Sequence, residues 1–205
     1  GETNTRVGNG NSPYINQEGK RFVAEDERRD VMAAAILEQT GSCCWLISTK
    51  GNNELDENNL NAYGLSLDYL LESGKVYMAD TLEELAAQIN MDPAALTETI
   101  AKFNEAVDKG YDEEFGRTLF APNSKIEEGP FYACRRAPAV HHTMGGVEID
   151  SDTRVYNTDG AVIAGLYACG EVTGGIHGAN RVGGNAITDA ITFGRIAGQS
   201  VVEGK

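Results

Sequence analysis

The spacing of hydrophobic positions along the chain predicts helices in five places. Each prediction rests on apolar residues that recur at helical spacing beside a capping residue, an acidic first turn or a terminal glycine. In the fourth segment the apolar stripe runs between Asp92-Pro93 and Gly110, and we expect it to be buried. The predicted helices are residues 26–38, 65–72, 82–89, 93–109 and 185–203.

Short apolar runs bounded by turn residues predict extended segments. Residues 14–16 and 21–23 are predicted to pair as a hairpin, and residues 155–162 to turn at Asp159-Gly160. Residues 166–169 are predicted to form a fully buried strand. The remaining extended segments are expected at 44–48, 131–134, 137–143 and 147–150.

Length and composition fit a folded domain with a sizeable core. The chain has 205 residues, of which 41% are hydrophobic and 23% are charged. Its character changes near residues 130–137, where an α+β part gives way to a β-rich part that ends in a helix. We therefore expect an α+β fold in two parts.

The charge balance excludes some classes of partner. The net charge is −14 and no basic stripe is present, so we expect no nucleic-acid partner.

No apolar run approaches the ~20 residues that a membrane span needs. The four cysteines fit no zinc or redox spacing, so we expect free buried thiols and no metal site.

The candidate chemistry lies in two glycine-rich segments, residues 141–146 and 170–187, which contain all three histidines. Glu171 follows a predicted strand, where a carboxylate can accept hydrogen bonds from ligand hydroxyls or act as a loop acid. The helix that begins near Asn185 offers amide donors to an anion or simply follows a tight loop. Arg181 lies between them as an anion clamp or a structural ion-pair partner.

These segments closely resemble the soluble FAD-dependent fumarate reductases, within the wider succinate dehydrogenase/fumarate reductase flavoproteins. The resemblance runs through nearly the whole chain in the family's order. The matching segments are residues 16–22, 29–30, 112–117, 141–146, 165–175 and 177–189.

The resemblance implies a division into two domains. Residues 1–132 resemble the family's capping domain, with helices and a small mixed sheet. Residues 133–205 resemble the C-terminal remnant of its α/β FAD-binding domain, which is β-rich and ends in a helix. The family's Gly-x-Gly-x-x-Gly pattern is absent, because Pro13 stands where Gly8-Asn9-Gly10 would need a third glycine. We therefore expect a C-terminal fragment that lacks its N-terminal FAD-binding half.

The resemblance also assigns roles around noncovalently bound FAD. Glu171 would hold sugar or ribityl hydroxyls, and His142, Ala186 and Ile187 would lie against the flavin. Without its other half, the fragment is expected to bind FAD weakly or not at all, to be inactive, and to be able to self-associate through open strand edges.

The implied reaction is hydride transfer from reduced FAD to the C=C bond of an α,β-unsaturated carboxylate such as fumarate, urocanate or an acrylate. His141 and Arg181 would clamp the substrate carboxylate. Arg29 would be the cap arginine that delivers the proton, with Glu2 and Arg6 as candidates for the relay that replaces it.

Other functions remain open from the sequence. The chain could be a non-catalytic cap-like module, or a separate subunit that assembles with an FAD-binding chain. Within the family, a ketosteroid dehydrogenase-like flavoprotein is the enzymatic alternative. The localisation is unknown from the sequence: we expect a soluble, bacterial-type protein that is cytoplasmic or exported, depending on the missing N-terminus.

Overall fold

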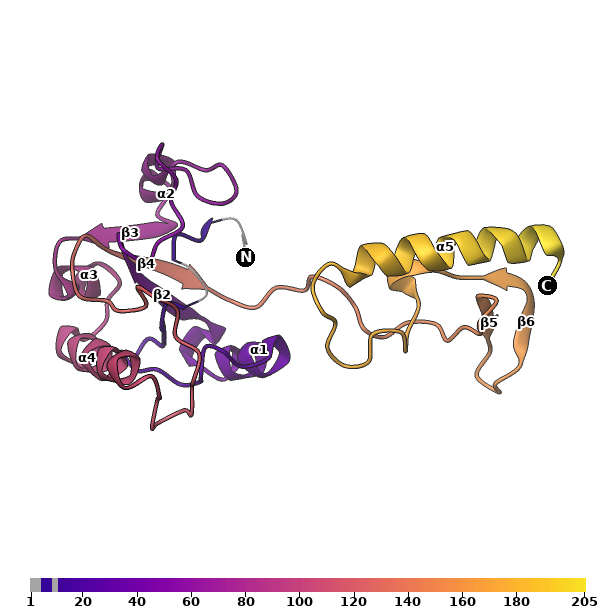
Figure 1. Ribbon diagram of the computed structural model, residues 1–205, viewed down its shortest axis with the longest axis horizontal. Helices are drawn as coiled ribbons and strands as arrows, with labels where there is room; N and C mark the ends of the chain where they lie inside the picture. The colour runs from indigo at the N-terminus through magenta and orange to yellow at the C-terminus, as the bar shows by residue number, and fades with distance from the viewer. Residues whose placement is uncertain (1–4, 9–10) are drawn as a thin grey trace. The chain divides into compact units, whose positions relative to one another are not determined.

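The computed structural model describes residues 5–8 and 11–205, which divide into two compact units. The first unit runs to Ala139 and the second begins at Val140. Figure 1 shows the elements of each unit in chain order. Glu2, a relay candidate, and Asn9 and Gly10 of the incomplete glycine pattern lie outside the described residues.

The first unit is built on a four-stranded sheet in the order β1-β2-β4-β3, and every pairing in it is antiparallel. β4 pairs with β2 along its whole length and continues to Arg136. The division between the two units therefore falls after β4, whereas the domain boundary expected at 132/133 lies within this strand. The strands are β1 (Tyr14–Ile15), β2 (Cys44–Thr49), β3 (Val76–Ala79) and β4 (Phe131–Arg136).

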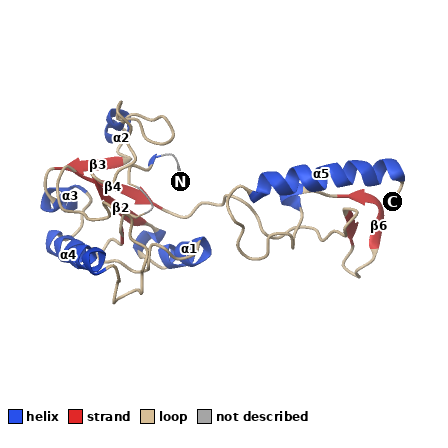
Figure 2. Cartoon of the chain, in the orientation of Figure 1, coloured by secondary structure: helices blue, strands red, loops and turns tan. Residues whose placement is uncertain are grey.

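Helices pack against this sheet (Figure 2). Asp92 accepts a hydrogen bond from the Ala94 amide at 3.0 Å where α4 begins, and Gly110 ends it in the left-handed conformation. The Thr81 hydroxyl likewise caps α3 by accepting from the Glu84 amide at 3.2 Å. The helical segments of this unit are α1 (Arg29–Leu37), the 3₁₀ segment η2 (Thr40–Ser42), α2 (Leu67–Glu72), α3 (Leu82–Gln88) and α4 (Pro93–Lys109).

The core lies on both faces of the sheet, because all six residues of β2 are buried. Trp45 and Ile47 belong to the cluster that includes the apolar stripe of α4. Leu46, which points to the opposite face, belongs to a second cluster with Leu70 of α2 and Val76 of β3. The predicted burial of the α4 stripe is confirmed for Leu96, Ile100 and Phe103, while Val107 is partly buried against the same cluster.

The hairpin predicted from residues 14–16 and 21–23 is wrong. A turn from Asn16 to Lys20 is present, but β1 pairs with β2 instead of with residues 21–23. The Arg21 side chain is buried in ion pairs with Glu25 and Asp112, so side-chain contacts hold this segment in place of a strand pairing.

The second unit contains a two-stranded antiparallel sheet and one long helix. The turn between its strands lies at residues 157–161, as predicted. The fully buried strand expected at residues 166–169 is wrong, because β6 ends at Tyr167 and Leu166 is 45% exposed. Its elements are β5 (Arg154–Tyr156), β6 (Val162–Tyr167), the 3₁₀ segment η3 (Gly170–Val172) and α5 (Asn185–Glu203).

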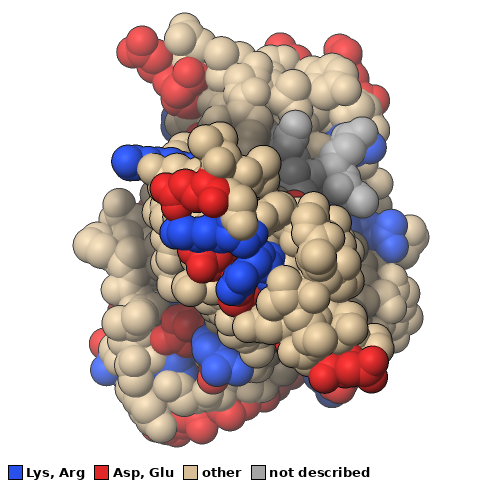
Figure 3. All heavy atoms as spheres, turned by 90° about the vertical axis from the view of Figure 1, so that its right-hand side faces the viewer, with Lys and Arg blue, Asp and Glu red and all other residues tan. Residues whose placement is uncertain are grey.

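Only one face of α5 is covered within this unit. Asp189 and Ser200 are buried, whereas Ile187, Ile191 and Val202 are 68%, 67% and 87% exposed. In Figure 3, red and blue groups are scattered and most of the visible atoms are uncharged.

The α+β class predicted from the sequence is confirmed for the described residues.

We expect Cys44, which is buried on β2, to resist thiol reagents in the folded protein at pH 8. Burial, and secondarily the adjacent Cys43 thiol, raises the pKa of Cys44 to about 12, so little nucleophilic thiolate forms. Unfolding returns the pKa to about 8.5 and should make the thiol reactive. Mass spectrometry after labelling with and without denaturant measures this, and labelling of Cys44 in the folded state contradicts it.

Candidate functional site

Glu171 and His142, both predicted to bind the cofactor, lie together in the second unit. The Glu171 carboxylate accepts a hydrogen bond from the Thr143 amide at 2.9 Å and lies 3.7 Å from His142 Nδ1. The amide of Thr143, and secondarily the charge of His142, lower the pKa of Glu171. The carboxylate is therefore held ionised and, at 54% exposure, remains open to hydroxyl donors.

Glycines allow the two motif segments to approach this closely. Val147 donates its amide to the carbonyl of Val172 at 2.9 Å, and Gly174 donates to the carbonyl of Val147 at 3.0 Å. A Cβ placed on Gly174 would lie 2.8 Å from the Gly146 nitrogen, and one on Gly146 would overlap the Val172 carbonyl. The glycine pair therefore lets the segment after His142 run beside η3.

Replacing Gly146 by alanine is expected to destabilise the second unit and detach the His142 segment from Glu171. The added methyl group meets backbone atoms that cannot rotate away, so we expect a loss of about 1–3 kcal/mol. Gly145→Ala is the matched control, because a Cβ there meets nothing within 4 Å. Limited proteolysis after residue 140 measures the difference, and equal resistance of the two variants contradicts the prediction.

The start of α5 presents unsatisfied backbone donors. Gly184, at φ 88°, precedes the helix and supplies no side chain to cap it. Among the described residues, the Ala186 amide has no hydrogen-bond acceptor, and the Ile187 side chain beside it is exposed. A helix N-terminus of this kind favours a polar or anionic group.

Arg181 and His141, the two residues predicted to bind the substrate, form no hydrogen bond with each other in the described part of the chain. Arg181 is 6% exposed, and its Nη1 donates to the Val182 carbonyl at 3.1 Å. Its Nε is buried and has no hydrogen-bond partner among the described residues. His141 is exposed, and within the described part of the chain no hydrogen bond links it to Arg181. Arg181 thus retains unused donor capacity.

Arg29, the predicted proton donor, belongs to the first unit, where it is the first residue of α1. Its side chain is exposed and has no ion pair or hydrogen bond among the described residues. The neighbouring Arg28 pairs instead with Asp30 at 2.8 Å. Arg6, a relay candidate, forms an ion pair with Glu54, which sequence reasoning did not identify.

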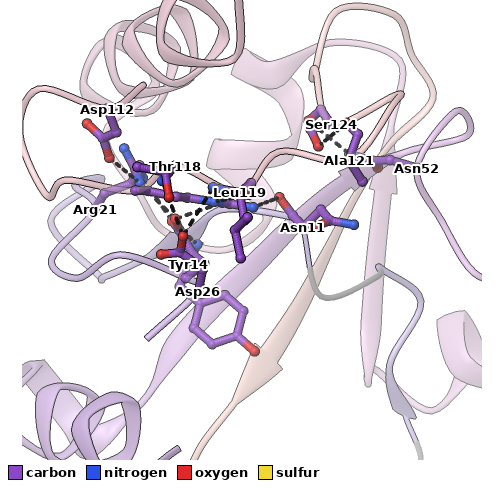
Figure 4. A network of polar contacts seen from close by, with 12 residues as sticks. Asn11, Tyr14, Arg21, Asp26, Asn52, Asp112, Thr118, Leu119, Ala121 and Ser124 are labelled. Atoms are coloured by element: carbon purple, nitrogen blue, oxygen red, sulfur yellow. Dashed lines mark hydrogen bonds and ion pairs between the residues drawn. The ribbon is translucent and has the colours of Figure 1, made fainter. Parts of the chain in front are cut away.

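A buried ionic network ties the chain just before α1 to the 112–119 loop (Figure 4). The Glu25 carboxylate is fully buried and accepts hydrogen bonds from Arg21 at 2.7 and 2.8 Å and from Arg117 at 2.8 Å. The next residue, Asp26, accepts from the amides of Thr118 and Leu119. The segment that leads into α1 is therefore fixed by contacts some ninety residues away in sequence.

Sequence reasoning missed a second polar pair, between His177 and Asp189. His177 Nε2 lies 3.2 Å from Asp189 Oδ2, and the His177 ring also contacts the His142 ring. No local pattern links His177, within a glycine-rich loop, to Asp189 in α5, twelve residues later. The available signal was that all three histidines of the chain fall in this region.

Two classes of feature are not found in the described part of the chain. No cluster of three or more histidine, cysteine, aspartate or glutamate side chains there could hold a metal ion. Over the same residues, no helix is both long and apolar enough to cross a bilayer.

Comparison with known proteins relates most of the chain to flavoproteins. Residues 5–187 match the family described as FAD binding domain. The chain is 46% identical over 190 residues to the NADH:acrylate oxidoreductase of Vibrio harveyi, covering 93% of this chain and 18% of that protein.

Two solved structures are similar in fold. The open conformation of a flavocytochrome c3 fumarate reductase matches with a TM-score of 0.68 and 36% identity, over 94% of this chain and 32% of that one. A 3-ketosteroid delta1-dehydrogenase from Sterolibacterium denitrificans matches with a TM-score of 0.75 and 25% identity, over 98% and 40%. The chain thus spans less than half the length of each of these relatives.

Proposed function

Because the chain belongs to the FAD-binding domain family, we propose that it is part of a flavin-dependent reductase of α,β-unsaturated carboxylates. In this proposal residues 1–132 form the capping domain and residues 133–205 the C-terminal part of the FAD-binding domain. The observation that carries it is the grouping of His142, Glu171 and the uncapped start of α5 in one unit. Bound FAD would supply the hydride.

The residues present fit a noncovalently held flavin. The Glu171 carboxylate, held ionised by the Thr143 amide, suits the hydroxyls of a sugar or ribityl chain. The free amide of Ala186 and the positive end of α5 suit the electron-rich edge of a reduced flavin. The exposed Ile187 side chain suits its apolar ring face.

Arg181 and His141 would bind the substrate carboxylate. The Arg181 guanidinium has an unpaired donor and can engage a carboxylate in two parallel hydrogen bonds. His141 is exposed and can donate to the same anion. Donors fixed at a carboxylate stabilise the enolate-like charge that develops as the alkene accepts hydride, which is where electrostatic catalysis acts.

Arg29 would deliver the proton to the neighbouring carbon. An arginine guanidinium is a proton carrier of very high pKa. The Arg29 side chain has no partner among the described residues that would hold it elsewhere. It can act as an acid only if its proton is replaced promptly, and Glu2 and Arg6 are the relay that we propose for this step.

The uncovered apolar residues of α5 and β6 support a missing N-terminal half. Ile187, Ile191 and Val202 form a stripe on one side of α5, and Leu166 of β6 is also exposed. Such a surface on a small unit is normally covered by protein. The chain alone is therefore expected to hold FAD poorly, to be inactive, and to be able to self-associate.

The test uses the full-length protein that contains this chain, with a reduced viologen as electron donor. We expect a yellow protein that oxidises the viologen when acrylate, fumarate or urocanate is added. A colourless protein that is inactive with all three acids overturns the proposal and favours a non-catalytic module. Activity only after addition of a second, FAD-binding chain favours a separate subunit.

A 3-ketosteroid arm tests the enzymatic alternative. The similarity to a ketosteroid dehydrogenase structure favours that activity as the second candidate. A steroid has no carboxylate for Arg181 and His141, so we expect no turnover with it. Turnover of the steroid without turnover of the unsaturated acids overturns the carboxylate assignment.

A further inference from the structure

In the second unit, His177 and Asp189 form a polar pair to which no role has been assigned. His177 Nε2 lies 3.2 Å from Asp189 Oδ2, and the two side chains are 12% and 3% exposed. His177 comes from the glycine-rich loop that follows η3, and Asp189 lies near the start of α5. The pair therefore ties this loop to the helix.

The loop has few other anchors close to His177. Gly175 and Gly178, on either side of it, have positive φ angles of 84° and 61°, and a Cβ at either would meet nothing within 4 Å. The local backbone is therefore permissive and loosely packed, so the place of the imidazole depends on its own contacts.

Among the described residues, the Asp189 side chain has no hydrogen-bond partner other than His177. Its second oxygen, Oδ1, is buried and has no hydrogen-bond partner among the described residues. A buried carboxylate is costly unless it is paired, so His177 is the group that compensates the burial of Asp189 here.

The pair continues into the residues proposed to face the cofactor. The rings of His177 and His142 pack edge to face, with centroids 5.4 Å apart and planes at 72°. His142 Nδ1 in turn lies 3.7 Å from the Glu171 carboxylate. A continuous row of four side chains, Asp189, His177, His142 and Glu171, thus links α5 to η3.

We infer that the Asp189–His177 pair positions the His142 imidazole, and through it Glu171, for cofactor binding. Both are positioning residues, since the pair acts through the His142 ring and is not assigned a contact with FAD. An edge-to-face ring held by a buried carboxylate restricts the rotamers open to His142. This inference rests on the proposed function, because only there does His142 face FAD.

FAD affinity of the full-length protein tests the inference. The variants are Asp189→Asn, His177→Gln and the double variant, with the exposed Asp159→Asn in the 157–161 turn as matched control. We expect each single change to weaken FAD binding about tenfold, by analogy with outer-shell partners of metal ligands. The double variant should bind no more weakly than the weaker single variant, since both remove one interaction. Titration of apoprotein followed by flavin fluorescence measures this.

A second measurement, independent of FAD, uses the three histidines of the chain. We expect Asp189→Asn to shift the ring proton resonances of His177 and His142, while the exposed His141 changes little. An unmoved His142, or single-variant effects on FAD affinity that add fully in the double variant, overturns the inference.

The outcomes separate this inference from the proposed function. Wild-type protein that binds no FAD overturns the proposed function and the cofactor role of the pair, while the resonance shifts still decide whether the pair fixes His142. Wild-type protein that binds FAD, together with single variants that bind it equally well, overturns the inference alone.

Discussion

Replacing Arg29 by glutamine in the full-length protein is expected to lower kcat by about 10²- to 10⁴-fold, the range that a general acid contributes. The side chain lies exposed at the start of α1 and has no partner among the described residues, so its removal breaks no contact there. The loss should therefore appear in kcat with FAD still bound. Viologen oxidation with a saturating unsaturated acid, together with the flavin spectrum, measures both.

Arg28→Gln is the matched control for this prediction. Arg28 has the same side chain one position earlier, is also exposed, and pairs with Asp30 on the surface. We expect its kcat to stay within a few-fold of the wild-type value, because surface pairs contribute little. Equal activity of the Arg29 and Arg28 variants contradicts the assignment of Arg29 as proton donor.

Replacing Glu25 by glutamine is expected to destabilise the first unit by about 3–5 kcal/mol, as for other broken buried ion pairs. The change keeps the shape of the side chain but removes the charge that Arg21 and Arg117 share. Burial by itself lowers the pKa of Arg21, but its hydrogen bonds with Glu25 and Asp112 outweigh this and raise it. In the variant Arg21 keeps Asp112 as a partner, whereas Arg117 loses the carboxylate with which it pairs.

Urea unfolding followed by Trp45 fluorescence measures this loss, because Trp45 is the one tryptophan of the chain and is buried in the core of the first unit. Glu98→Gln is the control, since Glu98 pairs with Lys102 on the exposed face of α4. We expect that variant to unfold close to the wild-type urea concentration. A Glu25 variant as stable as the Glu98 variant shows that the network is dispensable.

Much of the secondary structure could be predicted from local pattern. α4 begins at Pro93 and ends before Gly110 as its cap residues predict, and α5 spans the predicted residues 185–203. Caps and periodicity act over a few residues, so the sequence shows them directly. The pairing of β1 with β2 was not predicted, because a strand partner thirty residues away leaves no local signal.

Some contacts of the candidate site were likewise expected from the sequence, and others were not. The family resemblance implied that His142 and Glu171 contact the cofactor, and the structure brings these two side chains together. The contact between His177 and Asp189 was not foreseen, because it depends on how the loop folds back onto α5. The resemblance implied that Arg29 is the proton donor. The segment that leads into its helix is held by Glu25, whose partner Arg117 lies 92 residues away in sequence, and the sequence did not show this contact.

The sequence by itself determined the family, the glycine positions that let two backbone segments meet, and the helices with clear caps. Only the tertiary structure decided which charges are buried and paired, as with Glu25 and Arg117, which are 92 residues apart. It also decided that one face of α5 is buried and the other exposed. The physical reason is that hydrogen bonding within helices and turns is local, whereas burial and ion pairing require distant parts of the chain to pack together.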